Sequence, residues 1–316
     1  MSIIEKAVDR LSKEDQARSD DAAELLSARA SDSDVHVDAN EDQPGLESGV
    51  EHAVRNVDES PVPEHVDISF KSLNIEGLLS PEGGRTRLDE EYRMVKRPLL
   101  VRAFAGTNLG GCPLNLIMVT SALSGEGKTF TTMNLAISIA MEMDRTVLMI
   151  DSDLAKPSLS RHLQVSDRPG FTECLKDPDL DLGQFLLRTD VPKLTVLSAG
   201  TRNNRATELL ASNTMKSRLQ ELSSRYSDRI VLFDSPPLLA TSESSVLASH
   251  MGQVAVVVEY GGTPQFLVRE AIGMLRNEDA VSLILNKTRD DFLSKHVGGY
   301  GYGYGKGYGY GAYGEK

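Results

Sequence analysis

Short apolar runs recur through the central part of the chain and alternate with stretches of helical periodicity. The apolar runs cover 115–120, 146–150, 194–199, 230–234, 254–259 and 282–286, and the helical candidates between them include 128–143, 205–224 and 265–277. Continuous apolar strands separated by helices are typical of a parallel sheet that helices cover on both faces. The pattern therefore predicts one α/β domain over residues 86–297.

The two ends of the chain have a different pattern. Residues 14–66 are rich in Asp, Glu, Ser, Ala and Pro, and such a segment buries too little apolar surface to offset its ordering entropy. We expect residues 1–85 to be a mostly disordered acidic segment and residues 298–316, rich in glycine and tyrosine, to be a flexible tail. A short amphipathic helix is predicted near the N-terminus from the apolar positions Ile3, Ile4, Ala7, Val8 and Leu11. It is too short to be stable alone, so it is either a docking peptide or a frayed end.

The charge of the chain is unevenly distributed. The formal net charge is −12, and residues 1–85 hold 20 acidic and 8 basic residues, whereas the remainder holds 26 of each sign. The absence of a basic excess argues against nucleic-acid binding. Cys112 and Cys174 have no CxxC spacing and no histidine partner, so we interpret them as thiols in a reducing compartment. No apolar run reaches the ~18 residues of a membrane span and no signal sequence is recognisable, so we expect a cytoplasmic protein.

The strongest motif is TSALSGEGKTFTT at 120–132. It fits a phosphate-binding loop, Ala122-x4-Gly127-Lys128-Thr129, with alanine where the usual pattern has glycine. Glycines let the backbone N–H groups face phosphate oxygens, and a helix that begins at the lysine directs its positive end to the same place. Lys128 would neutralise the β- and γ-phosphates and Thr129 would ligate Mg²⁺. The predicted cofactors are ATP and Mg²⁺, and the nucleotide-binding residues are Ser124, Gly125, Glu126, Gly127, Lys128, Thr129 and Phe130. The alternative is a plain strand-to-helix turn.

Two later strands end in carboxylates. VLMIDSD carries Asp151 and Asp153, and IVLFDSPP carries Asp234. Parallel strands deliver their carboxyl ends to one edge of the sheet, where ligands bind, so the three side chains are expected to meet near Thr129. A single aspartate at a strand end is often a helix cap, but three together favour a metal site. We predict Thr129, Asp153 and Asp234 as metal ligands, Asp234 in the outer shell. Lys128, Asp151 and Asp153 are the candidate catalytic residues, the carboxylates as base or orienting group.

At this point the chain resembles a family, over roughly residues 70–316. SGEGKT, Asp151-Ser152-Asp153-Leu154 and IVLFDSPP resemble the Walker A, A′ and B motifs of the bacterial tyrosine kinases of exopolysaccharide systems. These are P-loop NTPase-like proteins of the deviant-Walker group. ILNKT at 284–288 resembles the base-reading segment of related ATPases, which implies an adenine contact for Asn286, although a polar strand end is also often a turn former. The resemblance assigns the tail as an autophosphorylation cluster of Tyr300, Tyr302, Tyr304, Tyr308, Tyr310 and Tyr313.

The chain also departs from the family pattern. Ala155 and Lys156 stand where the family often has two arginines. Leu123 stands where partition-type ATPases carry a signature lysine, which favours the kinase. By resemblance, an E-x2-R-x2-K motif from Glu90, Arg93 and Lys96 would build a ring of subunits, with lysine where the family usually has arginine. A solvated, charged helix is the alternative for this motif.

The resemblance implies an ATP-dependent protein-tyrosine autokinase that phosphorylates the tails of neighbouring subunits and regulates exopolysaccharide polymerisation, chain length or export. Glycine keeps such a tail flexible, and each phosphate adds about −1.5 to −2 charges that would loosen the ring. The implied partners are other copies of the chain, a membrane adaptor of the polysaccharide co-polymerase type that recruits it to the inner face of the plasma membrane, and a phosphotyrosine phosphatase. The alternatives are a deviant-Walker ATPase switch that positions cargo without kinase activity, a regulatory binding protein whose ATPase site controls ring assembly, and, for the tail, an adhesive or phase-separating segment.

Overall fold

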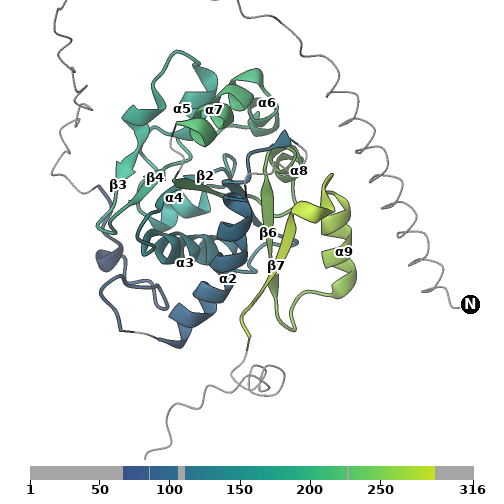
Figure 1. The fold of residues 1–316 in the computed structure, drawn as a ribbon. Coiled ribbons are helices and arrows are strands. Elements are labelled where there is room, and N and C mark those ends of the chain that lie inside the picture. The colour runs from purple at the N-terminus through teal and green to yellow at the C-terminus, as the bar shows by residue number, and fades with distance from the viewer. Residues whose placement is uncertain (1–66, 85, 106–110, 226–227, 289–316) are drawn as a thin grey trace, which may run out of the picture. The chain divides into compact units, whose positions relative to one another are not determined.

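The computed structural model describes residues 67–84, 86–105, 111–225 and 228–288, which surround one central β-sheet (Figure 1). The chain divides into two units between residues 62 and 63, and every described residue belongs to the second. The helix predicted over 2–13 and the tail over 298–316 lie outside the described residues. Within the described ranges, no helix combines the length and the hydropathy that a membrane span requires.

The sheet confirms the predicted fold class. Its seven strands lie in the order β3-β4-β2-β5-β1-β6-β7, and all neighbours are parallel except β3 and β4. The central strand β1 is buried along its whole length, as a strand covered on both faces must be. The two-residue strand β3 is absent from the predicted set. The bounds are β1 Leu116–Ser121, β2 Thr146–Asp151, β3 Leu187–Arg188, β4 Leu194–Leu197, β5 Arg229–Asp234, β6 Gln253–Glu259 and β7 Val281–Asn286.

Helices cover both faces of the sheet, and each face has its own apolar core. Leu99 of α2 and Met133 of α3 belong to one core, whereas Phe171 of α5, Leu219 of α7 and Leu247 of α8 belong to the other. The α-helices are α2 Arg87–Ala103, α3 Lys128–Ala140, α4 Ser158–His162, α5 Phe171–Lys176, α6 Ala206–Leu210, α7 Asn213–Ser224, α8 Ser242–Ala248 and α9 Gln265–Gly273. Short 3₁₀ turns are η1 Phe70–Ser72, η3 Leu182–Phe185 and η4 Glu278–Ala280.

The predicted helix over 205–224 is in fact two helices. The hydroxyl of Ser212 accepts a hydrogen bond from the N–H of Met215 at 3.1 Å, so Ser212 is the N-cap at which α7 begins after α6 has ended. The other two predicted helices, 128–143 and 265–277, end at Ala140 and Gly273. Helix α2 lies against α3 and begins with a capping box at Thr86.

Residues 67–84 pack against the core although the sequence analysis places them in the acidic N-terminal segment. Phe70 and Leu79 are buried. The backbone N–H of Phe70 donates to the carboxylate of Asp190 at 2.9 Å, and that of Leu79 donates to the side-chain oxygen of Asn134 in α3 at 2.8 Å. The packed part of the chain therefore begins before the predicted boundary. The apolar residues of this segment are too sparse to form a periodic pattern. Its backbone is held by hydrogen bonds to polar side chains elsewhere in the domain.

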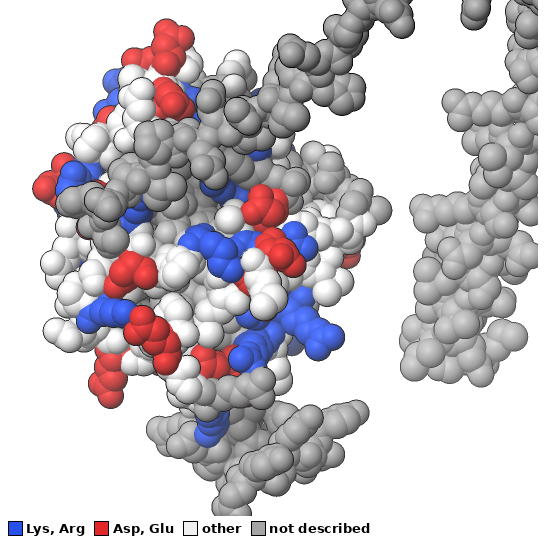
Figure 2. Space-filling model, turned by 60° about the vertical axis from the view of Figure 1, so that its left-hand side comes forward, with Lys and Arg blue, Asp and Glu red and all other residues white. Residues whose placement is uncertain are grey.

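The charge of the described residues is mixed. Figure 2 shows lysine and arginine interspersed with aspartate and glutamate over the coloured part of one face, without a continuous field of one sign. This agrees with the equal numbers of acidic and basic residues after residue 85. Cys174 is buried and Cys112 half-buried, and both are free thiols, as expected.

Candidate nucleotide-binding site

The loop between β1 and α3 has the backbone of a phosphate-binding loop. Gly125 and Gly127 have φ angles of 86° and 94°, which residues with a Cβ rarely adopt, and Gly127 is the N-cap of α3. A Cβ added at Gly125 would meet nothing within 4 Å, so the space beside this residue is open. The free N–H groups at the start of α3 and the helix dipole both favour an anion at this place. Lys128 begins the helix at the same point.

The side chain of Glu126 holds the loop from the inside. Glu126 is 2% exposed, and its carboxylate accepts hydrogen bonds from the N–H of Leu123 at 2.6 Å, from the N–H of Glu259 at 3.3 Å and from the hydroxyl of Thr263. Glu259 ends β6 and Thr263 lies in the following turn. The side chain of Glu126 is engaged with the protein. The predicted contact between Glu126 and the nucleotide would therefore be made by its backbone.

The end of β7 supports the loop from the same side. The amide nitrogen of Asn286 donates to the carbonyl of Glu126 at 2.8 Å, and a Cβ on Gly127 would lie 2.2 Å from that nitrogen. The ammonium group of Lys287 donates to the carbonyl of Gly125 at 2.9 Å and pairs with Glu259 at 2.9 Å. Asn286, predicted to contact adenine, thus lies against the loop backbone.

Three residues that support the loop were not predicted from the sequence: Lys287, Glu259 and Thr263. Their positions at the carboxyl ends of β6 and β7 are the signal that could have found them, because that edge of a parallel sheet gathers ligand-binding residues.

Asp234 connects β5 to the first turn of α3. Its carboxylate accepts a hydrogen bond from the hydroxyl of Thr129 at 2.7 Å and a longer one from Thr132 at 3.4 Å. Asp234 is fully buried. The predicted pairing of Thr129 with a strand-end carboxylate is therefore present in the structure, in the position where a hydroxyl and a carboxylate can share a magnesium ion or its water.

Asp151 and Asp153 follow β2, the neighbour of β5. Asp151 stands opposite Asp234 in the strand register. One of its oxygens accepts from the N–H and the hydroxyl of Ser160 at 2.7 and 2.8 Å, and the other accepts from the N–H of Asp153 at 3.2 Å. Asp153 accepts a single bond, from the N–H of Lys156 at 2.8 Å. The structure therefore brings the three predicted carboxylates together and holds Asp151 more firmly than Asp153.

The three carboxylates lie close together, and repulsion between their charges disfavours the ionised form. Burial raises the pKa of Asp151, and the neighbouring charge of Asp234 raises it further. Burial also raises the pKa of Asp234, against the opposing effects of Lys128 and the hydrogen bond from Thr129. The pKa of Asp153 is raised by burial too, although Lys128 again opposes the rise. A site in which buried carboxylates meet a loop built for anions is suited to a ligand that carries both a cation and phosphates.

The donor set fits Mg²⁺ with a nucleoside triphosphate. Hydroxyl and carboxylate oxygens are the ligands that Mg²⁺ prefers, and it is commonly held by one or two carboxylates together with substrate phosphates. Among the described residues, no group of three or more His, Cys, Asp or Glu side chains has the arrangement of an all-protein metal cage. Thr129, Asp234 and Asp153 could hold the ion together with the phosphates.

Two other predicted loop residues have different surroundings. Ser124 is exposed at the tip of the loop. The ring of Phe130 lies on the opposite side, where a Cβ on Gly77 would approach it to 3.1 Å. Phe130 thus contacts the packed segment over 67–84 with its side chain.

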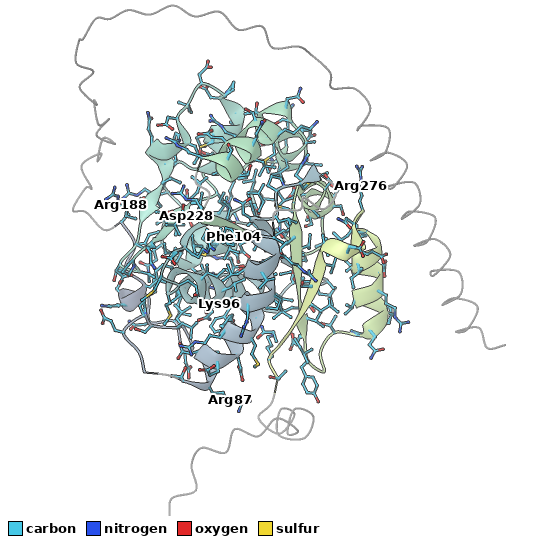
Figure 3. All side chains as sticks on the ribbon, in the orientation of Figure 1. Arg87, Lys96, Phe104, Arg188, Asp228 and Arg276 are labelled. Atoms are coloured by element: carbon cyan, nitrogen blue, oxygen red, sulfur yellow. The ribbon has the colours of Figure 1, made fainter. Side chains whose placement is uncertain are left out.

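The predicted oligomerisation motif is divided between the surface and the interior. Glu90 and Arg93 form an exposed ion pair at 2.8 Å. Lys96, labelled on α2 in Figure 3, is 7% exposed, and its ammonium group contacts the carbonyl of Ser138 and the carboxylate of Glu142, each at 2.6 Å. The side chain of Lys96 is therefore not part of the predicted surface patch and contacts the end of α3 instead. The six tail tyrosines lie outside the described residues.

Comparisons with known proteins agree with this geometry. Residues 117–293 match the family model of the CobQ/CobB/MinD/ParA nucleotide binding domain. The tyrosine-protein kinase ptk of Acinetobacter johnsonii is 30% identical over 208 residues, which are 66% of this chain and 27% of that protein. The tyrosine-protein kinase YwqD of Bacillus subtilis is 30% identical over 217 residues, 67% of this chain and 86% of that protein. The succinoglycan biosynthesis transport protein ExoP of Rhizobium meliloti is 30% identical over 198 residues, 60% of this chain and 24% of that protein.

Solved structures give the same picture. The kinase domain of VpsO matches with a TM-score of 0.50 and 31% identity, over 65% of this chain and all of that one. The kinase domain of the Escherichia coli tyrosine kinase ETK matches with a TM-score of 0.53 and 25% identity, over 69% of this chain and 80% of that one. The chain thus spans the whole VpsO kinase domain and 80% of the ETK kinase domain, but about a quarter of the length of ptk and of ExoP.

Proposed function

Because the chain belongs to the bacterial tyrosine kinases within the CobQ/CobB/MinD/ParA nucleotide-binding family, we propose that it transfers the γ-phosphate of ATP to protein tyrosines. The observation that carries this proposal is the convergence of the glycine loop with Asp151, Asp153 and Asp234 at one sheet edge. Each part of phosphoryl transfer has a candidate group there.

The phosphates would lie on the N–H groups of the loop and of the first turn of α3. Lys128 neutralises the β- and γ-phosphate oxygens as the transferred group loosens. A bound magnesium ion would supply positive charge against the negative charge that develops on the phosphates. Thr129 and Asp234, which are hydrogen-bonded to each other, would hold the ion, with Asp153 as the third oxygen donor. Asn286 and Lys287 fix the loop from behind, so it is preorganised for the phosphates.

The attacking phenol needs a group that orients it or accepts its proton. Asp153 suits this role better than Asp151, because Asp153 accepts one hydrogen bond and Asp151 accepts three. Asp151 then acts as a positioning residue whose carboxylate holds the N–H of Asp153.

The acceptors in this proposal are the tail tyrosines of neighbouring copies, Tyr300, Tyr302, Tyr304, Tyr308, Tyr310 and Tyr313. The exposed pair of Glu90 and Arg93 would contribute to a ring of subunits, and accumulated phosphate charge would loosen it. The names of related proteins, which include a succinoglycan biosynthesis transport protein, support a role in exopolysaccharide polymerisation or export. We further propose recruitment to the plasma membrane by an adaptor and reversal by a phosphotyrosine phosphatase.

The test is phosphate transfer by the purified full chain with radiolabelled ATP and Mg²⁺. We expect label on the tail tyrosines, loss of label in Lys128→Ala, and normal label in Lys176→Ala, a matched change of an exposed lysine in α5. Changing all six tail tyrosines to phenylalanine should remove most of the label while ATP binding persists.

ATP hydrolysis without phosphotyrosine, also when the cytoplasmic fragment of a membrane adaptor is added, would refute the kinase proposal. It would instead favour a deviant-Walker ATPase switch that positions cargo, which the same family model also covers.

A further inference from the structure

An apolar groove lies between α2 and β7, away from the phosphate-binding loop. Its volume is about 400 Å³. Figure 1 shows α2 and β7 as neighbours, and β7 is the last strand of the sheet. The groove is lined mainly by aliphatic side chains and by the last described residue, and the lining includes Met94, Pro98, Leu99, Leu283, Leu285 and Thr288.

The groove exposes apolar surface that a soluble domain usually covers. Met94 is 62% exposed, Leu283 58% and Leu285 46%. Large apolar side chains that gather in one groove mark a binding surface more often than scattered ones do. In addition, β7 pairs with β6 on one side and with no other described strand, so its outer backbone groups are unpaired within the described residues. Exposed strand edges are commonly covered by a helix, a loop or another segment.

We propose that this groove is the docking site of residues 289–297 of the same chain, with Phe292, Leu293 and Val297 as the inserted side chains. The segment reads RDDFLSKHV, and beyond it the chain has no phenylalanine and no aliphatic residue larger than alanine. Thr288 already lines the groove, so the segment begins at its wall. Four residues of extended chain reach about 14 Å, so Phe292 cannot lie far from this groove.

The backbone at the end of β7 supports this route. Lys287 has a φ of 58°, the left-handed conformation in which a chain leaves the direction of a strand. Its side chain is held by the carbonyl of Gly125 and by Glu259, so the change of direction is fixed by two contacts. The chain therefore departs from the strand direction at Lys287, one residue before Thr288 lines the groove. Thr288 also lines a neighbouring cavity of about 230 Å³ with Tyr92 and Phe130, whose lining is mixed polar and apolar.

Two other occupants are less favoured by the structure. The amphipathic helix predicted over 2–13 is connected through more than fifty residues to Ile68, which pairs with Thr189 beside β3. Strand β3 is at the opposite edge of the sheet, six strand spacings or about 29 Å from β7. A second copy of the chain would have to compete with a segment that is covalently attached at the groove and so has a high effective concentration.

Docking of residues 289–297 would leave residues 298–316 as the portion that extends from the domain. The proposal concerns binding of one segment to one groove, so it does not depend on the proposed kinase activity. If the tail is the phosphate acceptor, the docked segment sets the point from which the tyrosines extend.

The test measures how well the segment shields a groove residue in the full chain. Leu285→Cys places a thiol in the groove, and its maleimide labelling rate is followed by peptide mass mapping. We expect labelling to be at least about tenfold faster when Phe292→Ser and Leu293→Ser are added, since each apolar side chain removed weakens docking by about tenfold or more. Tyr302→Ser with Tyr304→Ser is the matched control and should not change the rate. Phe292→Leu should restore slow labelling.

Equal labelling rates with and without the serine changes at 292 and 293 would overturn the proposal. Two results would assign the groove to another occupant and overturn it equally. Faster labelling after Ile4→Ser with Val8→Ser would indicate the N-terminal helix, and faster labelling on dilution would indicate a second copy. Thermal unfolding of each variant verifies that the domain stays folded.

Discussion

The substitution Lys96→Met is the sharpest test of the point where the structure corrects a prediction made from the sequence. The ammonium group of Lys96 donates to the carbonyl of Ser138 in the last turn of α3, whose usual helical donor, the N–H of Glu142, bonds to Ile139 instead. Methionine keeps the apolar stem but leaves this carbonyl without its charged donor. A hydrogen bond to a charged group contributes about 1.5–3 kcal/mol, and the favourable charge at a helix C-terminus about 0.3–1 kcal/mol.

The half-exposed ion pair with Glu142 adds at most about 1 kcal/mol. We therefore expect Lys96→Met to lower the free energy of unfolding by about 3 kcal/mol. For a domain of this size each kcal/mol corresponds to about 2–4 °C, so Tm should fall by about 6–12 °C. Urea unfolding and calorimetry give the stability, and sedimentation of the folded protein gives the assembly state.

Arg93→Ala is the comparison that separates packing from assembly. Arg93 pairs with Glu90 on the exposed face of α2, so its loss should change the free energy of unfolding by less than about 1 kcal/mol. If Lys96→Met left stability unchanged and abolished assembly, Lys96 would belong to a subunit interface and the reasoning from its burial would be wrong.

Three further predictions concern the loop, the carboxylates and the N-terminal packing. Glu126→Gln weakens a charge-assisted acceptor behind the phosphate-binding loop, so ATP affinity measured by calorimetry should fall by about tenfold, and an unchanged affinity would contradict the bracing role. Ser160→Ala removes one bond from Asp151, so the rate of phosphate transfer should fall while KM for ATP stays constant. The pKa of Asp190 is lowered because hydrogen bonds, the first from Ser69, outweigh the opposing effect of burial. Its stabilisation is therefore present above the unfolded pKa of about 3.9 and is lost as pH falls through the folded value, so Asp190→Asn should destabilise the protein near pH 7, and this effect should shrink as pH falls below about 3.9.

The sheet was predictable because its strands are nearly continuous apolar runs, and the six predicted runs all became strands. The carboxylate cluster was predictable for a related reason. Once the strands are parallel, Asp151 and Asp234 must finish at the same edge, and the register places them opposite each other. In both cases the regular backbone of a strand makes the position of a residue in space predictable from its position in the sequence.

The missed features depend on single polar contacts between distant segments. No period in the sequence relates Glu126 to Thr263, or Leu79 to Asn134, since each contact joins loops or turns to other elements. Lys96 was misplaced for a similar reason. Spacing of three put it on the face of Glu90 and Arg93, but a long side chain on the border of that face reached the neighbouring helix. Tertiary polar contacts of this kind carry no signal in local patterns.

The nucleotide site combines two arrangements that are each unfavourable without a ligand. The loop gathers unpaired N–H groups and Lys128 at the start of α3, whereas Asp151 and Asp234 are buried together with raised pKa values. The hydrogen bonds from Ser160 and Thr129 hold the carboxylates in place in spite of their repulsion. A ligand that brings phosphates to the loop and a divalent cation to the carboxylates relieves both arrangements at once. ATP with magnesium should therefore bind more tightly than either component binds alone, because each half of the site then stabilises the other.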